Sequence, residues 1–408
     1  MKEEYKDLNS KQLVQKLTDD YYNELNHAKE NGQIVAWASS IVPQEFMEAM
    51  DIKVAYPENH AAAIAAKGGA IPFLEKAEQM GYSNDICSYA RINLAYAEIL
   101  ESDLLDIPRP DFVVCMTNIC NTLIKWYENL AAYFNVPFIL IDVPYNTEYE
   151  VADNSVRYIV AQFKDFIKEL EKICGHSFDY KKFNEVMGIS RRAAKAWVRA
   201  SDYSTMEPSP LDGFNMFNYM ALIVCLRGRE ESVMLFDLIA KEMEEMAKNG
   251  ESQFKANQKH RVMWEGIACW PYLGHNYKTL RNSEIIMTGS TYPESWHIDY
   301  AMNDIEEMTR QYALRLDSAS LDKQIDMRVD VINHFSCDGV VYHINRSCKV
   351  MNFMQPYLRK QVFEKTQVPY TVFDGDQSDP NNFSKAQFET RVQALAENME
   401  SIAKEAAK

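Results

Sequence analysis

Two polar side chains near the start of the chain stand where a strand is expected to give way to a helix. Ser40 follows an apolar run at residues 34–37, and Glu58 follows a second run at residues 53–56. In open α/β sheets, the carboxyl ends of the strands form the edge at which ligands bind. A hydroxyl and a carboxyl at that edge could hold an oxygen atom of a substrate and transfer a proton. The structural alternative is that Ser40 caps a helix and Glu58 is a solvated carboxylate of a first helical turn.

Three cysteines fall in or just before the first turns of expected helices: Cys87, Cys120 and Cys348. A helix amino terminus lowers the pKa of a thiol, and the thiolate is the form that binds metal. Arg346 and Lys349 flank Cys348 and could stabilise an anionic sulfur or a phosphate there. The wide intervals between the three are unlike the compact Cys-x₂-Cys runs of ferredoxins, so buried thiols without metal are the alternative. The other cysteines are expected in the core or in loops: Cys115, Cys174, Cys225, Cys269 and Cys337.

Short apolar runs predict the strands that position these side chains. They cover residues 34–37, 53–56, 111–116 and 136–142 in the first half, and 261–266, 284–288, 339–344 and 370–373 in the second. Expected helices alternate with them, which is typical of parallel α/β sheets. The predicted fold class is therefore α/β. We expect two domains, each with a short, mostly parallel four-stranded sheet of buried strands flanked by helices (Rossmann- or flavodoxin-like), plus helical N-terminal and linking segments.

The expected helices and the domain boundary complete this outline. Apolar periodicity and capping residues predict helices at residues 10–31, 60–67, 74–80, 84–100, 120–133, 156–175, 183–186, 191–199, 216–225, 232–248 and 383–404. Residues 201–213 contain two prolines among Ser and Asp residues, a composition typical of a junction. We expect a first domain at residues 1–205 and a second at residues 206–408.

Composition and missing motifs exclude several function classes. The net charge of −16 and the pI near 5.1 argue against non-specific binding to nucleic acid or anionic membranes. No apolar run approaches the roughly 20 residues of a membrane-spanning helix, and residues 1–4 lack signal-peptide character, so we expect a cytoplasmic protein. There is no Gly-x-Gly-x-x-Gly after a strand, no P-loop and no His-Glu-x-x-His. Nicotinamide, nucleoside triphosphate and zinc-protease chemistry are therefore not indicated.

Six separated stretches carry a resemblance to a known family. They are Ser-Ser-x-Val-Pro-x-Glu at 39–45, Tyr-Pro-Glu-Asn-His at 56–60, Cys-Ser-Tyr-Ala-Arg at 87–91, Thr-Asn-Ile-Cys-Asn-Thr at 117–122, Gly-Val-Val-Tyr-His-Ile-Asn-Arg-Ser-Cys at 339–348 and Thr-Arg-Val-Gln-Ala-Leu-Ala-Glu at 390–397. In this order they resemble the 2-hydroxyacyl-CoA dehydratase family, which is related to benzoyl-CoA reductase subunits. The resemblance runs over nearly the whole chain.

The resemblance implies an oxygen-sensitive heterodimer with a homologous β subunit, in which each subunit holds a [4Fe–4S] cluster by three cysteines. Here the ligands would be Cys87, Cys120 and Cys348, and one iron would stay open. The implied reaction is elimination of water from a 2-hydroxyacyl-CoA through a ketyl radical, giving an (E)-2-enoyl-CoA. A separate ATP-dependent iron–sulfur activator would supply the electron, because nothing in this chain is expected to bind a nucleoside triphosphate.

The same resemblance gives roles to the polar corners. Ser40 would donate a hydrogen bond to the thioester oxygen or to the 2-hydroxyl, and Glu58 would act as acid and base, with His60 a weaker third candidate. The loop at 289–296 is placed to line the acyl pocket. Candidates for binding the coenzyme A phosphates are Arg346, Lys349 and a basic helix with Arg191, Arg192 and Arg199.

Other functions remain open at this stage. The chain could be the electron-relay subunit, although a relay cluster needs no acid–base residue beside it. It could also be a benzoyl-CoA reductase-type subunit, or a cluster carrier or CoA-binding module without enzymatic activity. No basic residue lies between Trp37 and Asp51, which favours an apolar acyl group such as isocaproyl.

Overall fold

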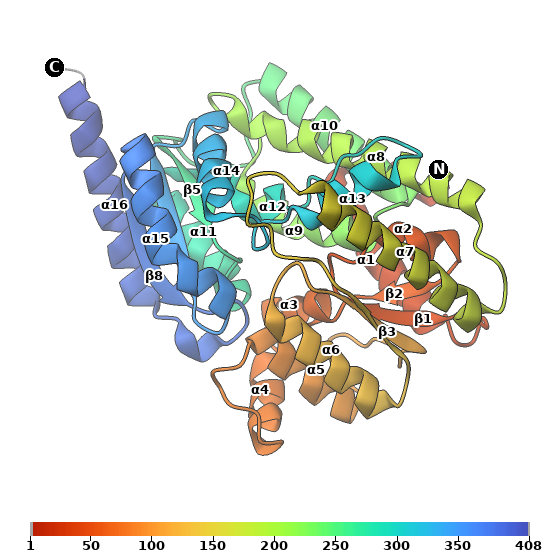
Figure 1. The fold of residues 1–408 in the computed structure, drawn as a ribbon. Helices are drawn as coiled ribbons and strands as arrows, with labels where there is room; N and C mark the ends of the chain where they lie inside the picture. Colours follow the sequence, from red (N-terminus) through yellow and green to blue (C-terminus); the bar gives the residue numbers. More distant parts are fainter. Residues whose placement is uncertain (1–2, 407–408) are drawn as a thin grey trace.

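Within residues 3–406, which the computed structural model describes, the strands form two parallel four-stranded sheets (Figure 1). The first sheet has the order β2-β1-β3-β4 and is built from β1 (Val35–Ala38), β2 (Lys53–Ala55), β3 (Phe112–Met116) and β4 (Phe138–Ile141). The second has the order β6-β5-β7-β8 and is built from β5 (His260–Glu265), β6 (Ile285–Ser290), β7 (Gly339–Asn345) and β8 (Tyr370–Gly375). The predicted α/β fold class is confirmed, and each expected strand is found within a few residues.

The position of a strand in its sheet explains its burial. β1 and β3 are central in the first sheet and every residue in them is buried, as the continuous apolar runs predict. β4 is an edge strand, and its Leu140 is 41% exposed. The expectation of a fully buried strand there is wrong, because in the described part of the chain β4 has a neighbouring strand, β3, on one side only.

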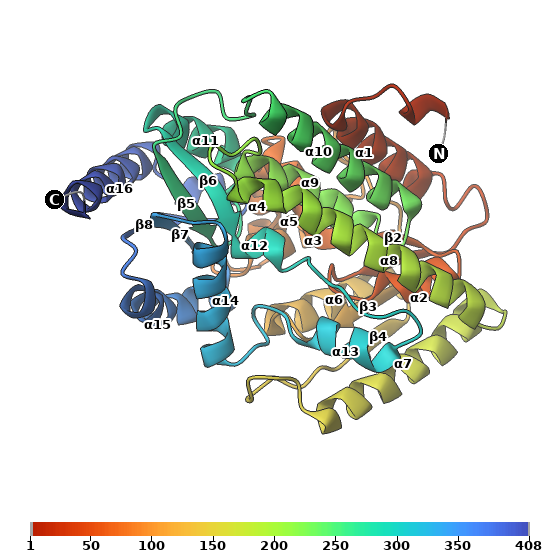
Figure 2. The same cartoon turned by 90° about the horizontal axis from the view of Figure 1, so that it is seen from above.

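Helices cover both faces of each sheet. In the first half, α2 (Gln44–Ala49) and α7 (Asp153–Cys174) pack together through Phe46, whose ring lies 5.1 Å from that of Phe163. α5 (Ser88–Ile99) and α6 (Asn121–Phe134) pack together elsewhere on this half. The second sheet lies between two helix pairs (Figure 2), namely α14 (Leu321–His334) with α15 (Lys349–Thr366), and α11 (Leu273–Asn282) with α16 (Lys385–Ala406).

A layer of long helices joins the halves: α1 (Ser10–Asn26), α8 (Tyr180–Ser201), α9 (Gly213–Cys225) and α10 (Glu230–Lys248). Shorter helices are α3 (Pro57–Ala66), α4 (Ala70–Gln79), α12 (Thr291–Glu294) and α13 (Ile305–Ala313), and 3₁₀ turns cover Glu3–Tyr5, Asp202–Thr205, Trp270–Tyr272 and Pro380–Asn382. Residues 183–199 form one helix rather than the two expected. α1 ends earlier than expected, and α5 begins at Ser88 rather than near residue 84.

One hydrophobic cluster contains buried side chains from both halves, including Trp37 in the first sheet and Trp264 in the second. The segment at 201–213, where a junction is expected, ends α8 and leads into α9. The division at residues 205/206 stays a prediction. None of the described helices is both long enough and apolar enough to span a membrane.

Candidate active site

The carboxyl ends of both sheets open onto one cavity of about 1700 Å³. Its wall includes residues that lie within about five positions of the ends of six strands: Ser40 after β1, Glu58 after β2, Cys120 after β3, Trp270 after β5, Tyr292 after β6 and Cys348 after β7. Strand ends that are distant in sequence therefore meet at one place, as expected for the ligand edge of parallel sheets.

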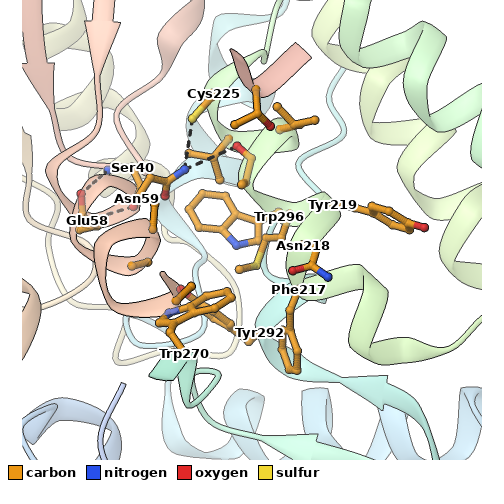
Figure 3. A pocket seen from close by; sticks show the side chains of 18 of the residues that line it. Ser40, Glu58, Asn59, Phe217, Asn218, Tyr219, Cys225, Trp270, Tyr292 and Trp296 are labelled. Atoms are coloured by element: carbon orange, nitrogen blue, oxygen red, sulfur yellow. Dashed lines mark hydrogen bonds between the residues drawn. The ribbon is translucent and has the colours of Figure 1, made fainter. Parts of the chain in front are cut away.

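Ser40 and Glu58 form a hydrogen-bonded pair in this wall (Figure 3). The Ser40 hydroxyl donates to Glu58 Oε1 at 3.0 Å, and the Ser40 backbone N–H donates to Oε2 at 3.0 Å. The Tyr127 hydroxyl also donates to Oε2, at 2.7 Å. Ser40 caps no helix, since the N-cap of α2 is Pro43, and Glu58 is not a solvated carboxylate. The structural alternative for this pair is therefore wrong.

Burial raises the pKa of Glu58 above its usual value, and the hydrogen bonds from Tyr127 and Ser40 only partly oppose that rise. A carboxyl with a raised pKa holds its proton closer to neutral pH and can both give and take one. The pair thus combines a hydroxyl donor with a proton carrier at the surface of the cavity.

Cys87, Cys120 and Cys348 all line this cavity, and each is the N-cap residue of a helix: α5, α6 and α15. Their side chains are partly exposed and none is in a disulfide. The three thiols are close enough to interact electrostatically: a negative charge on Cys87 or Cys120 would raise the pKa of Cys348, and a charge on Cys87 would raise that of Cys120. Three thiols from separate parts of the sequence are therefore brought together.

The expected lowering of these thiol pKa values is wrong in its net direction. Burial raises the pKa of Cys87 to about 11 and that of Cys120 to about 12, although backbone N–H groups of the first helical turns pull in the other direction. The thiols are therefore protonated near neutral pH, and a metal would have to displace the protons. Across residues 3–406, no group of three His, Cys, Asp or Glu side chains is arranged to hold a single metal ion.

The Asp376 carboxylate connects two of the cysteine-bearing corners. It accepts from the Ser88 hydroxyl at 2.5 Å and from the Ser347 backbone N–H at 3.1 Å. Ser88 follows Cys87 and Ser347 precedes Cys348, so one buried carboxylate fixes corners from the two halves of the chain. Nearby, Arg91 donates to Asp379 at 2.9 Å, a second buried link between the same segments.

We expect Asp376→Ala to lower the iron content of the anaerobically purified protein without removing any thiol. The Ser88 hydroxyl and the backbone N–H groups of Ser347, Ser378 and Asp379 would all lose this charged acceptor. Each buried donor left without a partner costs roughly 1–3 kcal/mol, and the corners of Cys87 and Cys348 would separate. Iron and acid-labile sulfide analysis measures this, with circular dichroism to verify folding. Asp374→Ala, on an exposed residue of β8, is the matched control. Unchanged iron in Asp376→Ala would show that this carboxylate does not position the two thiols.

Comparison with known proteins decides the family. The family model described as 2-hydroxyglutaryl-CoA dehydratase, D-component, matches residues 39–399. The chain belongs to the 2-hydroxyacyl-CoA dehydratase family. It is 45% identical to the (R)-2-hydroxyisocaproyl-CoA dehydratase alpha subunit of Clostridioides difficile, over 95% of both chains. It is 44% identical to the (R)-phenyllactyl-CoA dehydratase alpha subunit of Clostridium sporogenes, over 97% of both. Identity to the (R)-2-hydroxyglutaryl-CoA dehydratase subunit alpha of Acidaminococcus fermentans is 35%, over 95% of this chain and 96% of that one. The predicted family is confirmed, and with it an enzyme of the hydro-lyase class.

Several residues singled out in the sequence of this dehydratase chain lie outside the cavity. His60 is buried on α3, where its Nε2 lies 2.9 Å from the Leu105 carbonyl and burial lowers its pKa to about 4. Arg346 and Lys349 line a separate small depression together with Asp85. The expectation that these groups serve the site is not supported by their placement.

The arginines of α8 form ion pairs with acidic side chains outside the cavity. Arg192 pairs with Glu230 and Arg199 with Asp237 on the outer face of α8 and α10, and Arg191 is 3.3 Å from Asp299. Of the remaining cysteines, Cys225 does line the cavity, where its sulfur accepts from the Asn59 side chain at 3.2 Å.

The segment at 289–296 is not the loop that the sequence predicts, because it contains the end of β6 and the short helix α12, but it does contribute to the cavity wall. Tyr292, Ser295 and Trp296 line the cavity of the dehydratase, and Figure 3 shows the Trp296 indole near its centre. Two charged lining residues had no sequence signal, Arg315 and Asp317, because they lie in an irregular segment between α13 and α14. Burial raises the pKa of Asp317 to about 7.

Proposed function

We propose that this chain is the substrate-binding, cluster-bearing subunit of a 2-hydroxyacyl-CoA dehydratase. It would eliminate water from (R)-2-hydroxyisocaproyl-CoA, or a similar 2-hydroxyacyl-CoA, to give the (E)-2-enoyl-CoA. The observation that carries this proposal is that the Ser40–Glu58 pair and the three N-cap cysteines line one cavity. An electron-relay subunit would not need a proton carrier beside its thiols, so this pairing favours the substrate-binding subunit.

The donor set fits a [4Fe–4S] cluster. Cys87, Cys120 and Cys348 would hold it, and backbone N–H groups of the first helical turns lie at each sulfur to stabilise the thiolates. Ligands of a cluster bind different irons, so they need not meet the spacing of a single-ion site. When bound, such a cluster supplies an electron-transfer centre with one iron free to accept an oxygen ligand.

The proposed reaction needs an electron because the proton that must leave is on carbon 3, which the thioester does not acidify. One added electron would turn the thioester carbonyl into a ketyl radical anion, which expels the 2-hydroxyl group. The resulting enoxy radical has a much more acidic hydrogen on carbon 3, and after deprotonation the electron is returned. The electron is thus recycled, and only water is lost overall.

The polar pair would carry the proton steps. The Ser40 hydroxyl, which donates to Glu58 in the free protein, would turn to donate to the thioester oxygen or the 2-hydroxyl. Glu58 would protonate the departing hydroxide or accept the proton from carbon 3, and its raised pKa suits both tasks. Tyr127 would hold the carboxyl in place through its hydrogen bond.

The remainder of the cavity suits a long thioester. Typical small-molecule pockets enclose roughly 300–1,000 Å³, and this one is larger. From the cysteines it extends to α1 and to the end of α10, where Lys11 and Lys255 line it. Neither lysine is in an ion pair within the described chain. We propose that the coenzyme A phosphates bind at this end, rather than at Arg346 or on α8.

The proposed partners are a homologous β subunit and, transiently, an ATP-dependent iron–sulfur activator. The test is to copurify the chain with its β subunit without oxygen, add activator, ATP and a strong reductant, and follow 2-hydroxyisocaproyl-CoA by mass spectrometry. Formation of the 2-enoyl-CoA is expected. A complex that contains iron and sulfide but dehydrates no 2-hydroxyacyl-CoA would overturn the proposed function.

A further inference from the structure

Arg315 is a cation in the cavity wall, and no carboxylate of the described residues pairs with it. Its Nη1 donates to the Ser295 carbonyl at 2.7 Å, whereas its Nε is enclosed without an acceptor. Its Nη2 makes no hydrogen bond with any described residue. Within residues 3–406 no Asp or Glu lies within ion-pair distance of it. The guanidinium edge formed by Nε and Nη2 is therefore without a partner.

The neighbouring buried arginine is different, because its charge is balanced. Arg227 Nη1 donates to the Tyr312 hydroxyl at 2.8 Å, and that hydroxyl lies 2.8 Å from Glu45 Oε2. Glu45 also accepts from Tyr300. Arg227 does not line the cavity itself but lies behind its wall, over the ring of the lining residue Trp296 and 5.7 Å from the ring centroid. The Glu45 carboxylate therefore compensates the charge of Arg227 through the Tyr312 hydroxyl, and not that of Arg315.

Arg315 stays positively charged at neutral pH, although it is surrounded by protein and lies near a second arginine. Burial, followed by the like charge of Arg227, lowers the pKa of Arg315 to about 10, so the guanidinium is still protonated near pH 7. A buried charge is unfavourable unless a partner compensates it. An arginine edge with two parallel N–H groups suits a planar acceptor such as a carboxylate or a carbonyl-type oxygen.

We propose that Arg315 binds an anionic or strongly polarised oxygen of the acyl part of the substrate. This inference rests on the proposed function and deepens it. The oxygen has two sources: the distal carboxylate of a dicarboxylic acyl group, or the thioester and 2-hydroxyl oxygens that every substrate carries. The expectation of a purely apolar acyl pocket considered only residues near Ser40 in sequence, and Arg315 enters the same cavity from the second half.

The test is a binding measurement, without activator or reductant, on the anaerobic complex with its β subunit. Calorimetric titration gives Kd for coenzyme A, 2-hydroxyisocaproyl-CoA and 2-hydroxyglutaryl-CoA with wild type, Arg315→Met and Arg315→Gln. Loss of a charge-assisted hydrogen bond should raise Kd for the acyl thioester about 10- to 100-fold, with coenzyme A alone unaffected. Arg157→Met, which removes an exposed arginine of α7 outside the cavity wall, is the control and should bind like wild type.

Each outcome has a defined meaning. A weaker Kd for both thioesters assigns the common oxygens, and a weaker Kd for the glutaryl ester alone assigns the distal carboxylate; both support the proposal. Unchanged Kd values, or an equal loss for coenzyme A itself, overturn it. Arg315→Gln keeps a polar side chain and provides the measurement if Arg315→Met does not fold. The proposed function is tested separately by the turnover assay: if it is wrong, the activated wild-type complex forms no 2-enoyl-CoA, whatever Kd values are measured.

Discussion

Replacing Cys348 by alanine is expected to abolish dehydration and to remove about one four-iron cluster from each anaerobic heterodimer. The reason is the position of the thiol: Cys348 is the N-cap of α15, lines the cavity and lies close to Cys87 and Cys120. Two remaining thiols would leave a second iron without a protein ligand. Iron and acid-labile sulfide analysis gives the cofactor content, and enoyl-CoA formation gives the activity.

Cys174→Ala is the matched control for this experiment. Cys174 is a partly exposed free cysteine at the end of α7 and does not line the cavity. It should keep full iron content and full turnover. If Cys348→Ala retained its iron, Cys348 would be a core thiol and the assignment of all three ligands would have to be withdrawn.

Replacing Glu58 by glutamine is expected to lower kcat by about 10²- to 10⁴-fold while iron content and thioester binding stay near wild type. Glutamine has nearly the same shape, and its amide oxygen can still accept from the Tyr127 hydroxyl and the Ser40 backbone N–H, while its NH2 group donates to the Ser40 hydroxyl. It cannot, however, carry a proton. Steady-state kinetics of the activated complex measures this. Glu185→Gln, on the exposed surface of α8, should behave as wild type.

The dependence of the rate on pH gives a second test of Glu58, because a purely structural role of this residue would not affect it. The hydrogen bond from Tyr127 stabilises the charged carboxylate and so lowers the pKa of Glu58. Tyr127→Phe removes that bond, and the Glu58 limb of the rate profile should therefore move to higher pH. This direction holds whether the acid or the base form is needed. A limb that stays in place or moves to lower pH would show that another group titrates.

The strands of the sheets could be predicted because they are short apolar runs. The turns that carry Ser40 and Glu58 could be predicted because each run is followed by a proline that favours the start of a helix. β1 and β3 are buried on both faces, so their sequences read as continuous apolar runs. Pro57 begins α3 directly after β2, which places Glu58 in the first turn. The proposed set of cysteine ligands, in contrast, rests on the family resemblance, since the intervals between the three residues match no known metal-binding pattern.

The missed elements have physical reasons. α14 buries Gln324 and Arg328, the latter paired with Glu265, so its inward face does not show apolar periodicity. The sequence pattern predicts two helices on either side of Gly188, whereas α8 runs through it as one helix. A Cβ at residue 188 would approach the Met302 sulfur to 3.0 Å, so glycine lets this side chain pack closely against α8. Arg315 and Asp317 are in no regular element, and only tertiary structure brings them to the cavity.

The link that Asp376 makes between Ser88 and Ser347 has a consequence for assembly of the holoprotein. Two of the proposed ligands belong to the first half of the chain and the third to the second half, so binding of the proposed cluster and docking of the two halves would be thermodynamically linked. Whatever favours the docked arrangement would raise the affinity for the cluster, and the bound cluster would stabilise the docked arrangement by the same free energy. Oxidative loss of the cluster would then weaken the docking of the two halves, so that they would unfold less cooperatively, and it would also remove the proposed catalytic centre.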